Sequence, residues 1–187
     1  MEGFGEKLNL DLKQEKENLE RVSVMDLGEK GKGLVAKRDF KAGEEVFVVN
    51  GETINYATDY TMPLGEVEKV EPRLSKTVVQ YMNHSCDPNI APDQSNPRVY
   101  RAVRDIQEGE EVATNYAFLG YEFGQEMSID GKERKTFDLG CRCGSKNCKG
   151  KIRAYKNLTP EERKKYRSYV LLFLLDDEKY PYVPPTE

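Results

Sequence analysis

Three of the four cysteines, Cys141, Cys143 and Cys148, stand within eight residues, and the fourth, Cys86, lies far upstream. The amino terminus lacks the basic start and apolar core of a secretory signal, so we expect a reducing, intracellular compartment. Clustered thiols in such a compartment favour metal binding over disulfides. Zinc prefers tetrahedral thiolate surroundings, and the C-x-C-x4-C spacing supplies three ligands.

The fourth ligand must come from the segment at 83–89, which holds both Cys86 and the single histidine, His84. Cys86 completes an all-thiolate site and accounts for every cysteine, so we predict one structural zinc held by Cys86, Cys141, Cys143 and Cys148. Such a site has no open position for water or substrate. Free thiols on a loop are the alternative interpretation.

Two other sequence patterns could indicate a catalytic or a nucleotide-binding site, but both are weaker signals than the cysteines. A Ser-His or Cys-His nucleophile pair would have to use His84, and its sequence neighbours Ser85 and Cys86 do not supply the spatial geometry. The stretch from Gly31 to Ala36 fits G-x-G-x-x-A, but a turn follows it where a dinucleotide fold needs a helix. A tight turn is the default interpretation there.

Composition excludes some classes of protein. The 187 residues are 37% hydrophobic and 33% charged, enough for one domain with appendages. The longest apolar run, 169–175, is far too short to cross a bilayer, so a membrane protein is excluded. A net charge of -4 makes direct nucleic-acid binding the weaker expectation and a basic partner the better one.

The elements that must position these groups are mostly short strands. Residues 1–20 are rich in charge and are expected to form a solvated arm or a frayed helix. Apolar runs at 22–25, 33–36, 46–49 and 99–103 alternate with turn signals, which predicts many short strands. Thr159 and Pro160 then begin a helix, and apolar residues at helical spacing to Phe173 predict that it packs on the core.

The motifs, taken in order, resemble the SET-domain protein-lysine methyltransferases that carry a post-SET zinc loop. The resemblance rests on the motifs at 31–36, 80–89, 104–116 and 141–148 and covers roughly residues 21–152. It implies a mainly β fold of several small sheets, with a pseudo-knot where the segment after Asn83 passes the segment ending at Tyr116, and a C-terminal helix. The implied division is a charged arm at 1–20, a SET domain at 21–136, a post-SET zinc loop at 137–152, and a helix with a proline-rich tail at 153–187.

The resemblance also implies a chemistry. The family transfers methyl groups from S-adenosylmethionine to a lysine of a protein, such as a histone or another basic protein. Tyr116 matches the family's active-site tyrosine, and the zinc loop is expected to close over the cofactor. The positions that match the family's cofactor site are Lys30, Lys32, Gly33, Tyr60, Gln80, Asn83 and His84.

Three positions depart from the family's pattern. Val49 stands where a tyrosine is common, and Gln80 stands where an arginine is frequent. Thr114 replaces an aromatic residue that limits how many methyl groups are added, so di- or trimethylation is expected over strict monomethylation. The missing tyrosine leaves a second interpretation open, a catalytically weak SET-like module that binds proteins. A zinc-dependent nucleic-acid binder has little support beyond the cysteines.

Overall fold

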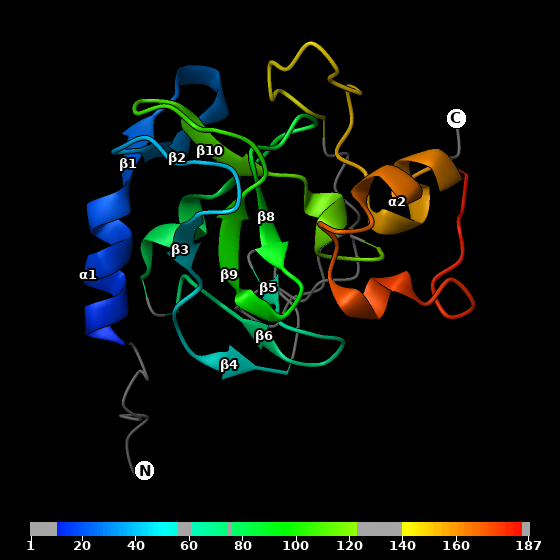
Figure 1. Ribbon diagram of the computed structural model, residues 1–187. Coiled ribbons are helices and arrows are strands. Elements are labelled where there is room, and N and C mark those ends of the chain that lie inside the picture. Colours follow the sequence, from blue (N-terminus) through cyan, green and yellow to red (C-terminus); the bar gives the residue numbers. More distant parts are fainter. Residues whose placement is uncertain (1–10, 56–60, 75, 123–139, 185–187) are drawn as a thin grey trace, which may run out of the picture.

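The computed structural model describes residues 11–55, 61–74, 76–122 and 140–184. Within them the chain is mainly β (Figure 1). The strands are β1 (Val22–Asp26), β2 (Lys32–Ala36), β3 (Glu45–Val48), β4 (Thr53–Ile54), β5 (Met62–Pro63), β6 (Lys69–Val70), β7 (Asn83–His84), β8 (Ile90–Asp93), β9 (Asn96–Ala102) and β10 (Glu111–Thr114). The α-helices are α1 (Leu12–Arg21) and α2 (Pro160–Tyr166), and the 3-10 helices are η1 (Gly28–Lys30), η2 (Val78–Tyr81), η3 (Tyr116–Phe118), η4 (Tyr155–Asn157) and η5 (Leu172–Leu175).

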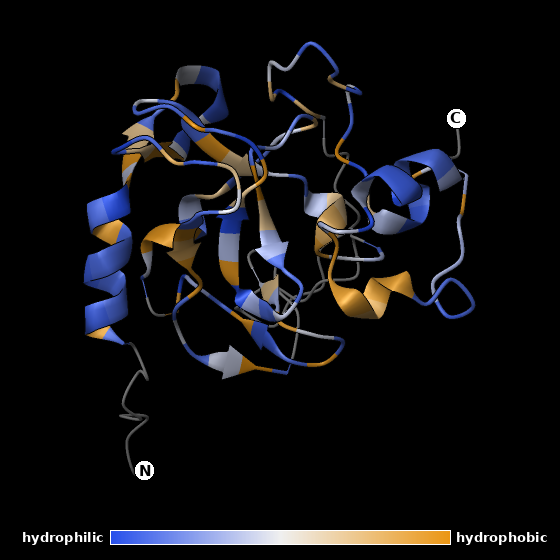
Figure 2. Ribbon diagram, in the orientation of Figure 1, coloured by the Kyte–Doolittle hydropathy of each residue, from blue (hydrophilic) through white to orange (hydrophobic). Residues whose placement is uncertain are grey.

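The strands of this part of the chain form small sheets with the orders β1-β2-β10-β7, β3-β9-β8 and β4-β6-β5. The predicted apolar runs at 22–25, 33–36, 46–49 and 99–103 fall on β1, β2, β3 and β9, which confirms the strand prediction. Their apolar side chains meet in one core, where Phe47 of β3 stacks on Tyr100 of β9 with ring centroids 4.9 Å apart. Figure 2 shows the hydrophobic residues gathered on these strands, while the surface loops are hydrophilic.

The sheet that matters most for the site joins distant segments. β7 pairs in parallel with β10, with Asn83 opposite Ala113 and His84 opposite Thr114. The pairing continues beyond β7, because the Ser85 N–H donates to the Thr114 carbonyl at 2.7 Å. The segment after Asn83 therefore lies beside the segment that ends at Tyr116. The threading of a pseudo-knot stays a prediction.

The amino-terminal region differs from the expected solvated arm or frayed helix over the residues that are described. Asp11 caps α1 by accepting from the N–H groups of Lys13 and Gln14, and the helix packs beside β3 (Figure 1). The fully buried Asn18 amide donates to the Val48 carbonyl at 2.8 Å and accepts from the Val48 N–H at 3.0 Å. Polar contacts such as this one hold the helix, which a pattern of apolar residues cannot reveal.

The carboxyl-terminal helix begins as predicted but is shorter. Thr159 and Glu162 form the capping box and Pro160 opens α2, which ends at Tyr166. The Gln94 amide then donates to the carbonyls of Arg167 and Val170, both at 2.8 Å. The chain turns after α2, where the Tyr169 N–H donates to the Tyr166 carbonyl at 2.8 Å, and Gln94 holds this turn before η5 completes the contact with the core.

No helix of the described ranges is long and apolar enough to cross a membrane.

We predict that Asn18→Ala destabilises the fold. The substitution leaves the Val48 N–H and carbonyl without their partner, and each unsatisfied buried group costs about 1 to 3 kcal/mol. The free energy of unfolding in urea should fall by about 2 kcal/mol or more. Lys16→Ala, on the exposed side of the same helix, should change it by less than about 0.5 kcal/mol. Equal effects of the two substitutions would show that the Asn18 contacts do not hold the helix.

Candidate functional site

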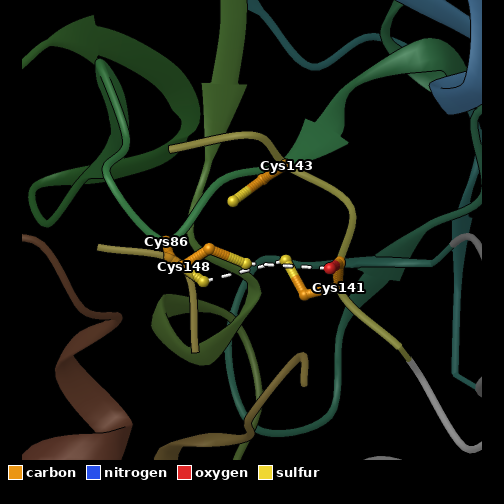
Figure 3. Close-up of side chains that lie close together, drawn as sticks. All are labelled: Cys86, Cys141, Cys143 and Cys148. Atoms are coloured by element: carbon orange, nitrogen blue, oxygen red, sulfur yellow. Dashed lines mark hydrogen bonds between the residues drawn. The ribbon is translucent and has the colours of Figure 1, made fainter. Parts of the chain in front are cut away.

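The four cysteines converge as the sequence predicts. All four sulfur atoms lie within 4.8 Å of one another, and Cys86 Sγ is 3.7 Å from Cys141 Sγ (Figure 3). Zinc–sulfur bonds of about 2.3 Å in a tetrahedron place the sulfurs about 3.8 Å apart. The arrangement therefore fits a tetrahedral ion with four thiolate ligands, and zinc is the metal that prefers this set.

The loop that carries three of these cysteines is closed at its base. Gly140 bridges to Lys151, and the Cys141 N–H donates to the Gly150 carbonyl at 2.8 Å. Gly144 turns the chain between Cys143 and Cys148 with a φ of 72°, which a residue with a Cβ rarely adopts. The loop is thus built to return its last cysteine toward its first. The expected zinc loop began at 137, and 137–139 lie outside the described residues.

The thiols lie in unequal electrostatic environments. Burial raises the pKa of Cys86 and of Cys141. Burial acts in the same direction on Cys143, but hydrogen bonds from the Cys86 backbone and from Ser145 outweigh it and lower the pKa of Cys143 to about 6. Cys143 therefore forms a thiolate more readily than Cys86 or Cys141.

His84 links the cysteine cluster to Tyr116. Its Nδ1 accepts from the Tyr116 backbone N–H at 3.2 Å, so the ring proton belongs on Nε2, which lies 3.4 Å from Cys86 Sγ. Burial, helped by the positive charge of Arg153, lowers the pKa of His84 to about 4. A neutral imidazole is what these two contacts require.

Tyr116 begins η3 directly after β10. Its hydroxyl donates to the Met82 carbonyl at 2.8 Å, and its ring meets the His84 ring edge-on with centroids 5.3 Å apart. The tyrosine is therefore held at its backbone, at its ring and at its hydroxyl, by residues of the segment that contains β7. The sequence singled out Tyr116 and His84, and the structure brings them together.

Gly33 and Asn83 also meet. A Cβ built on Gly33 would lie 2.7 Å from Asn83 Nδ2 and 2.4 Å from a methyl group of Leu27. Glycine is required here because β2 and Asn83 approach each other closely. Asn83 Nδ2 donates to the Lys32 carbonyl at 3.3 Å, which joins three of the predicted cofactor residues.

Of the remaining predicted cofactor residues, Lys30, Lys32 and Gln80 contact other residues of the chain. The Lys30 ammonium pairs with Glu111 at 2.6 Å, and the Lys32 ammonium lies 5.6 Å from the centre of the Tyr81 ring. The Gln80 amide donates to the Thr77 carbonyl within its own 3-10 turn. Tyr60 lies outside the described residues.

Sequence reasoning missed Glu111. Its carboxylate accepts from Asn83 Nδ2 at 3.0 Å in addition to its ion pair with Lys30. The signal was present in the alternation of β10, where Glu111 and Ala113 share one face and Ala113 pairs with Asn83. Two acidic residues next to a glycine, as in Gly109-Glu110-Glu111, are common in exposed turns. The sequence alone therefore does not reveal that Glu111 contacts Asn83 and Lys30.

A small open pocket lies between β7, the cysteine loop and α2, with His84, Asn115 and Tyr166 among its lining residues. Arg153, where the loop leaves the cysteine cluster, binds both oxygens of Glu162 at 2.6 and 3.0 Å. This bidentate pair fixes the exit of the cysteine loop on α2.

Comparison with known proteins identifies a family for the central part of the chain. The SET domain family matches residues 31–117. A probable histone-lysine N-methyltransferase, set-23, of Caenorhabditis briggsae is 29% identical over 154 residues, covering 69% of this chain and 59% of that protein. A histone-lysine N-methyltransferase of Yarrowia lipolytica described as H3 lysine-36 specific is 31% identical over 150 residues, covering 69% of this chain but 18% of the relative.

Solved structures agree with the fold. The methyltransferase domain of human histone-lysine N-methyltransferase SETMAR superposes with a TM-score of 0.51 at 20% identity, covering 71% of this chain and 58% of that one. KRYPTONITE, solved with mCHH DNA, an H3(1-15) peptide and SAH, gives a TM-score of 0.54 at 21% identity and covers 71% of this chain and 29% of that one. The chain spans less than two thirds of the length of each of these proteins.

We predict that the purified protein holds one zinc ion per chain and that Cys148→Ser weakens zinc binding by about tenfold or more. Even supporting residues around a zinc site are worth about 10- to 100-fold in affinity, and Cys148 is a direct ligand in this geometry. Metal analysis and a competitive chelator titration measure both quantities. Lys146→Ser, on the exposed tip of the same loop, is the matched control and should keep the full zinc content. Full zinc content in Cys148→Ser would contradict the four-thiolate site.

Proposed function

Residues 31–117 form a SET domain, and from this premise we propose that the chain is an S-adenosylmethionine-dependent protein-lysine methyltransferase. The observation that carries the proposal is the position of Tyr116, which is held by His84 and Met82 at the meeting point of the paired segments β7 and β10.

The residues around Gly33 fit the proposed cofactor. S-adenosylmethionine carries an amino acid, and the Lys32 carbonyl and the Asn83 amide, which meet beside Gly33, are polar groups of the kind that its ammonium and carboxylate would bind. Lys30, Lys32, Gly33 and Asn83 would hold this end, with Tyr60, Gln80 and His84 as further proposed contacts. When bound, the cofactor supplies an electrophilic methyl group on a positively charged sulfur.

Tyr116 would orient the substrate amine. Because its hydroxyl proton points to the Met82 carbonyl, the phenolic oxygen acts as an acceptor. An acceptor in this position directs the N–H groups of an approaching lysine and leaves the nitrogen lone pair aimed away from the ring. Most of the rate enhancement should then come from positioning and electrostatics.

The lysine must arrive neutral, although its ordinary pKa is about 10.4. A dry channel and a neighbouring cation both disfavour the charged ammonium, so no side-chain base is required. His84 is unsuited to that role, since one of its nitrogens accepts from Tyr116 and the other faces Cys86. His84 acts instead as a positioning residue for Tyr116.

A zinc ion bound by the four cysteines would have a structural role. Its ligands come from the segment after β7 and from the loop at 141–148, so the ion would hold both segments beside His84. We propose that the zinc loop closes over the cofactor, as the family resemblance implies.

The proposed substrate is a lysine in a histone or another basic protein. The relatives from Caenorhabditis briggsae and Yarrowia lipolytica are described as histone-lysine methyltransferases. The acidic net charge of -4 suits a basic partner and makes direct binding of nucleic acid the less favoured reading. Four cysteines that serve as zinc ligands suit an intracellular location, where thiols stay reduced.

Val49 is the observation that favours a second candidate, a catalytically weak SET-like protein-binding module. The residue is 1% exposed and supplies no hydroxyl where the family commonly has a tyrosine. Calorimetry with S-adenosylmethionine separates the two candidates, because the absence of binding by the zinc-loaded protein would favour the module.

We predict that Tyr116→Phe lowers turnover by about 100-fold or more while cofactor affinity changes little, since the lost oxygen acts on the amine. The assay uses labelled S-adenosylmethionine with recombinant histones and, as a second source, a protein lysate of the host. Tyr121→Phe, a tyrosine whose hydroxyl donates to the Pro181 carbonyl, is the matched control and should keep near-normal turnover. If the unaltered protein labels no lysine, the proposed function is overturned. Near-normal turnover of Tyr116→Phe would overturn only the role of Tyr116.

We predict that the product is di- or trimethyl-lysine. Thr114 is fully buried next to the Tyr116 backbone, and its small side chain leaves more room than an aromatic ring. Mass spectrometry of the reaction at completion measures the number of added methyl groups. Thr114→Phe should shift the product toward monomethyl-lysine, and a single added methyl group with the unaltered chain would contradict the prediction.

A further inference from the structure

The net charge of the whole chain conceals an uneven distribution of charge. Residues 140–170, which include the cysteine loop and α2, hold ten lysines and arginines against two acids, a net charge of +8. Because the whole chain has a net charge of -4, the remainder carries -12. The total made nucleic acid the less favoured partner, but a charged partner meets a local surface and responds to the field of that surface.

The basic residues of 140–170 divide by exposure. Three are wholly or partly buried, and each pairs with an acid: Arg153 with Glu162, Lys156 with Glu122 and Arg163 with Asp177. The other seven are exposed. Four lie on the cysteine loop, namely Arg142, Lys146, Lys149 and Lys151. Three lie on α2 or directly after it, namely Lys164, Lys165 and Arg167.

These seven exposed residues, called the basic surface below, have no ion-pair partner among the acids that the structure describes. The bases of the paired group hold elements of the fold together, whereas the basic surface presents its charges to solvent. Glu161 is the one exposed acid within 140–170. The positive charge of this surface is therefore largely uncompensated.

The loop part and the helix part of the basic surface lie next to each other. Arg153 joins the end of the loop to α2 through its two hydrogen bonds with Glu162. Lys149 and Lys151 line the same small pocket as Tyr166 of α2. Figure 1 shows the loop and α2 on the side of the molecule away from α1. One partner can therefore contact both parts at once.

The chemistry of the basic surface fits phosphate groups. Binding of nucleic acid without sequence preference neutralises phosphates with clustered lysines and arginines and requires no apolar contact. A protein interface, in contrast, has a centre that is more apolar and depleted of charge. None of the large exposed hydrophobic residues lies within 140–170, all of which the structure describes. An acidic protein is therefore the poorer match.

We propose that the basic surface binds the phosphate backbone of nucleic acid without sequence preference. This inference goes beyond the proposed function, in which the chain binds a cofactor and a protein substrate, and it does not depend on that function. Ammonium and guanidinium groups would contact phosphate oxygens, so binding releases counterions and weakens as the salt concentration rises.

The test measures fluorescence anisotropy of a short labelled DNA duplex with the zinc-loaded protein. We expect a dissociation constant of about 10 μM at physiological salt. If four of the seven bases reach phosphates, a rise in salt from about 50 to about 200 mM should weaken binding about 100-fold. A second DNA sequence should bind within about twofold of the first. An RNA duplex of the same sequence shows which nucleic acid binds more tightly.

Two variants with equal net charge locate the contact. The test variant combines three substitutions in the basic surface, Lys146→Gln, Lys164→Gln and Lys165→Gln. The control combines substitutions of three exposed lysines on or beside α1, Lys13→Gln, Lys16→Gln and Lys37→Gln. The test variant should weaken DNA binding about tenfold or more and show a smaller dependence on salt, while the control stays within about twofold. Unchanged zinc content and unfolding in urea establish that both variants are folded.

Three results would overturn the proposal. The first is that the unaltered protein binds neither duplex at low salt. The second is that the two variants bind DNA with equal affinity, since only the total charge or another surface would then matter. The third is that polyglutamate at equal charge binds more tightly than DNA in competition, which would assign the surface to an acidic protein. No cofactor is present in these measurements, so a failure of the proposed function leaves them unaffected.

Discussion

The site depends on the parallel pairing of β7 with β10. These two short strands bring Asn83 and His84 beside the residues that lead to Tyr116, although about thirty residues separate them along the chain. Consecutive side chains of a strand point to opposite faces, so Asn83 turns toward Gly33 and Glu111 while His84 turns toward Tyr116 and Cys86. The adjacent residues Asn83 and His84 thus contact the proposed cofactor site on one face and the proposed metal site on the other. A slip of one residue in this pairing would exchange the two faces and destroy both.

The cysteine cluster could be predicted because thiol ligands are few and chemically distinctive. Cys86 was identified at a distance because all four cysteines had to be accounted for, and their sulfurs do meet. The strands could be predicted from alternating short apolar runs, since burial of one face leaves that trace in the sequence. The strands are predicted from a local pattern of residues, and the metal site is predicted from a rare residue type.

Other features escaped prediction because they rest on a single long-range polar contact. The turn after α2 is held by Gln94, more than seventy residues away along the chain, whose amide binds the carbonyls of Arg167 and Val170. Glu111 resembles an ordinary surface acid until β10 is placed against Asn83. Hydrophobic periodicity predicts which faces are buried, but it does not predict which polar group a distant side chain will bind.

The contact between Asn18 and Val48 also protects the chain from association. β3 is an outer strand of its sheet, and outer strands present unpaired N–H and carbonyl groups to which another molecule can add a strand. Asn18 binds both groups of Val48, and the Asn50 amide exchanges hydrogen bonds with the Asp11 backbone in the same way, at 2.7 and 3.2 Å. The Asn18 amide therefore takes the place of a neighbouring strand at Val48, and the Asn50 amide holds the start of the same helix, so α1 works as a guard against edge-to-edge aggregation.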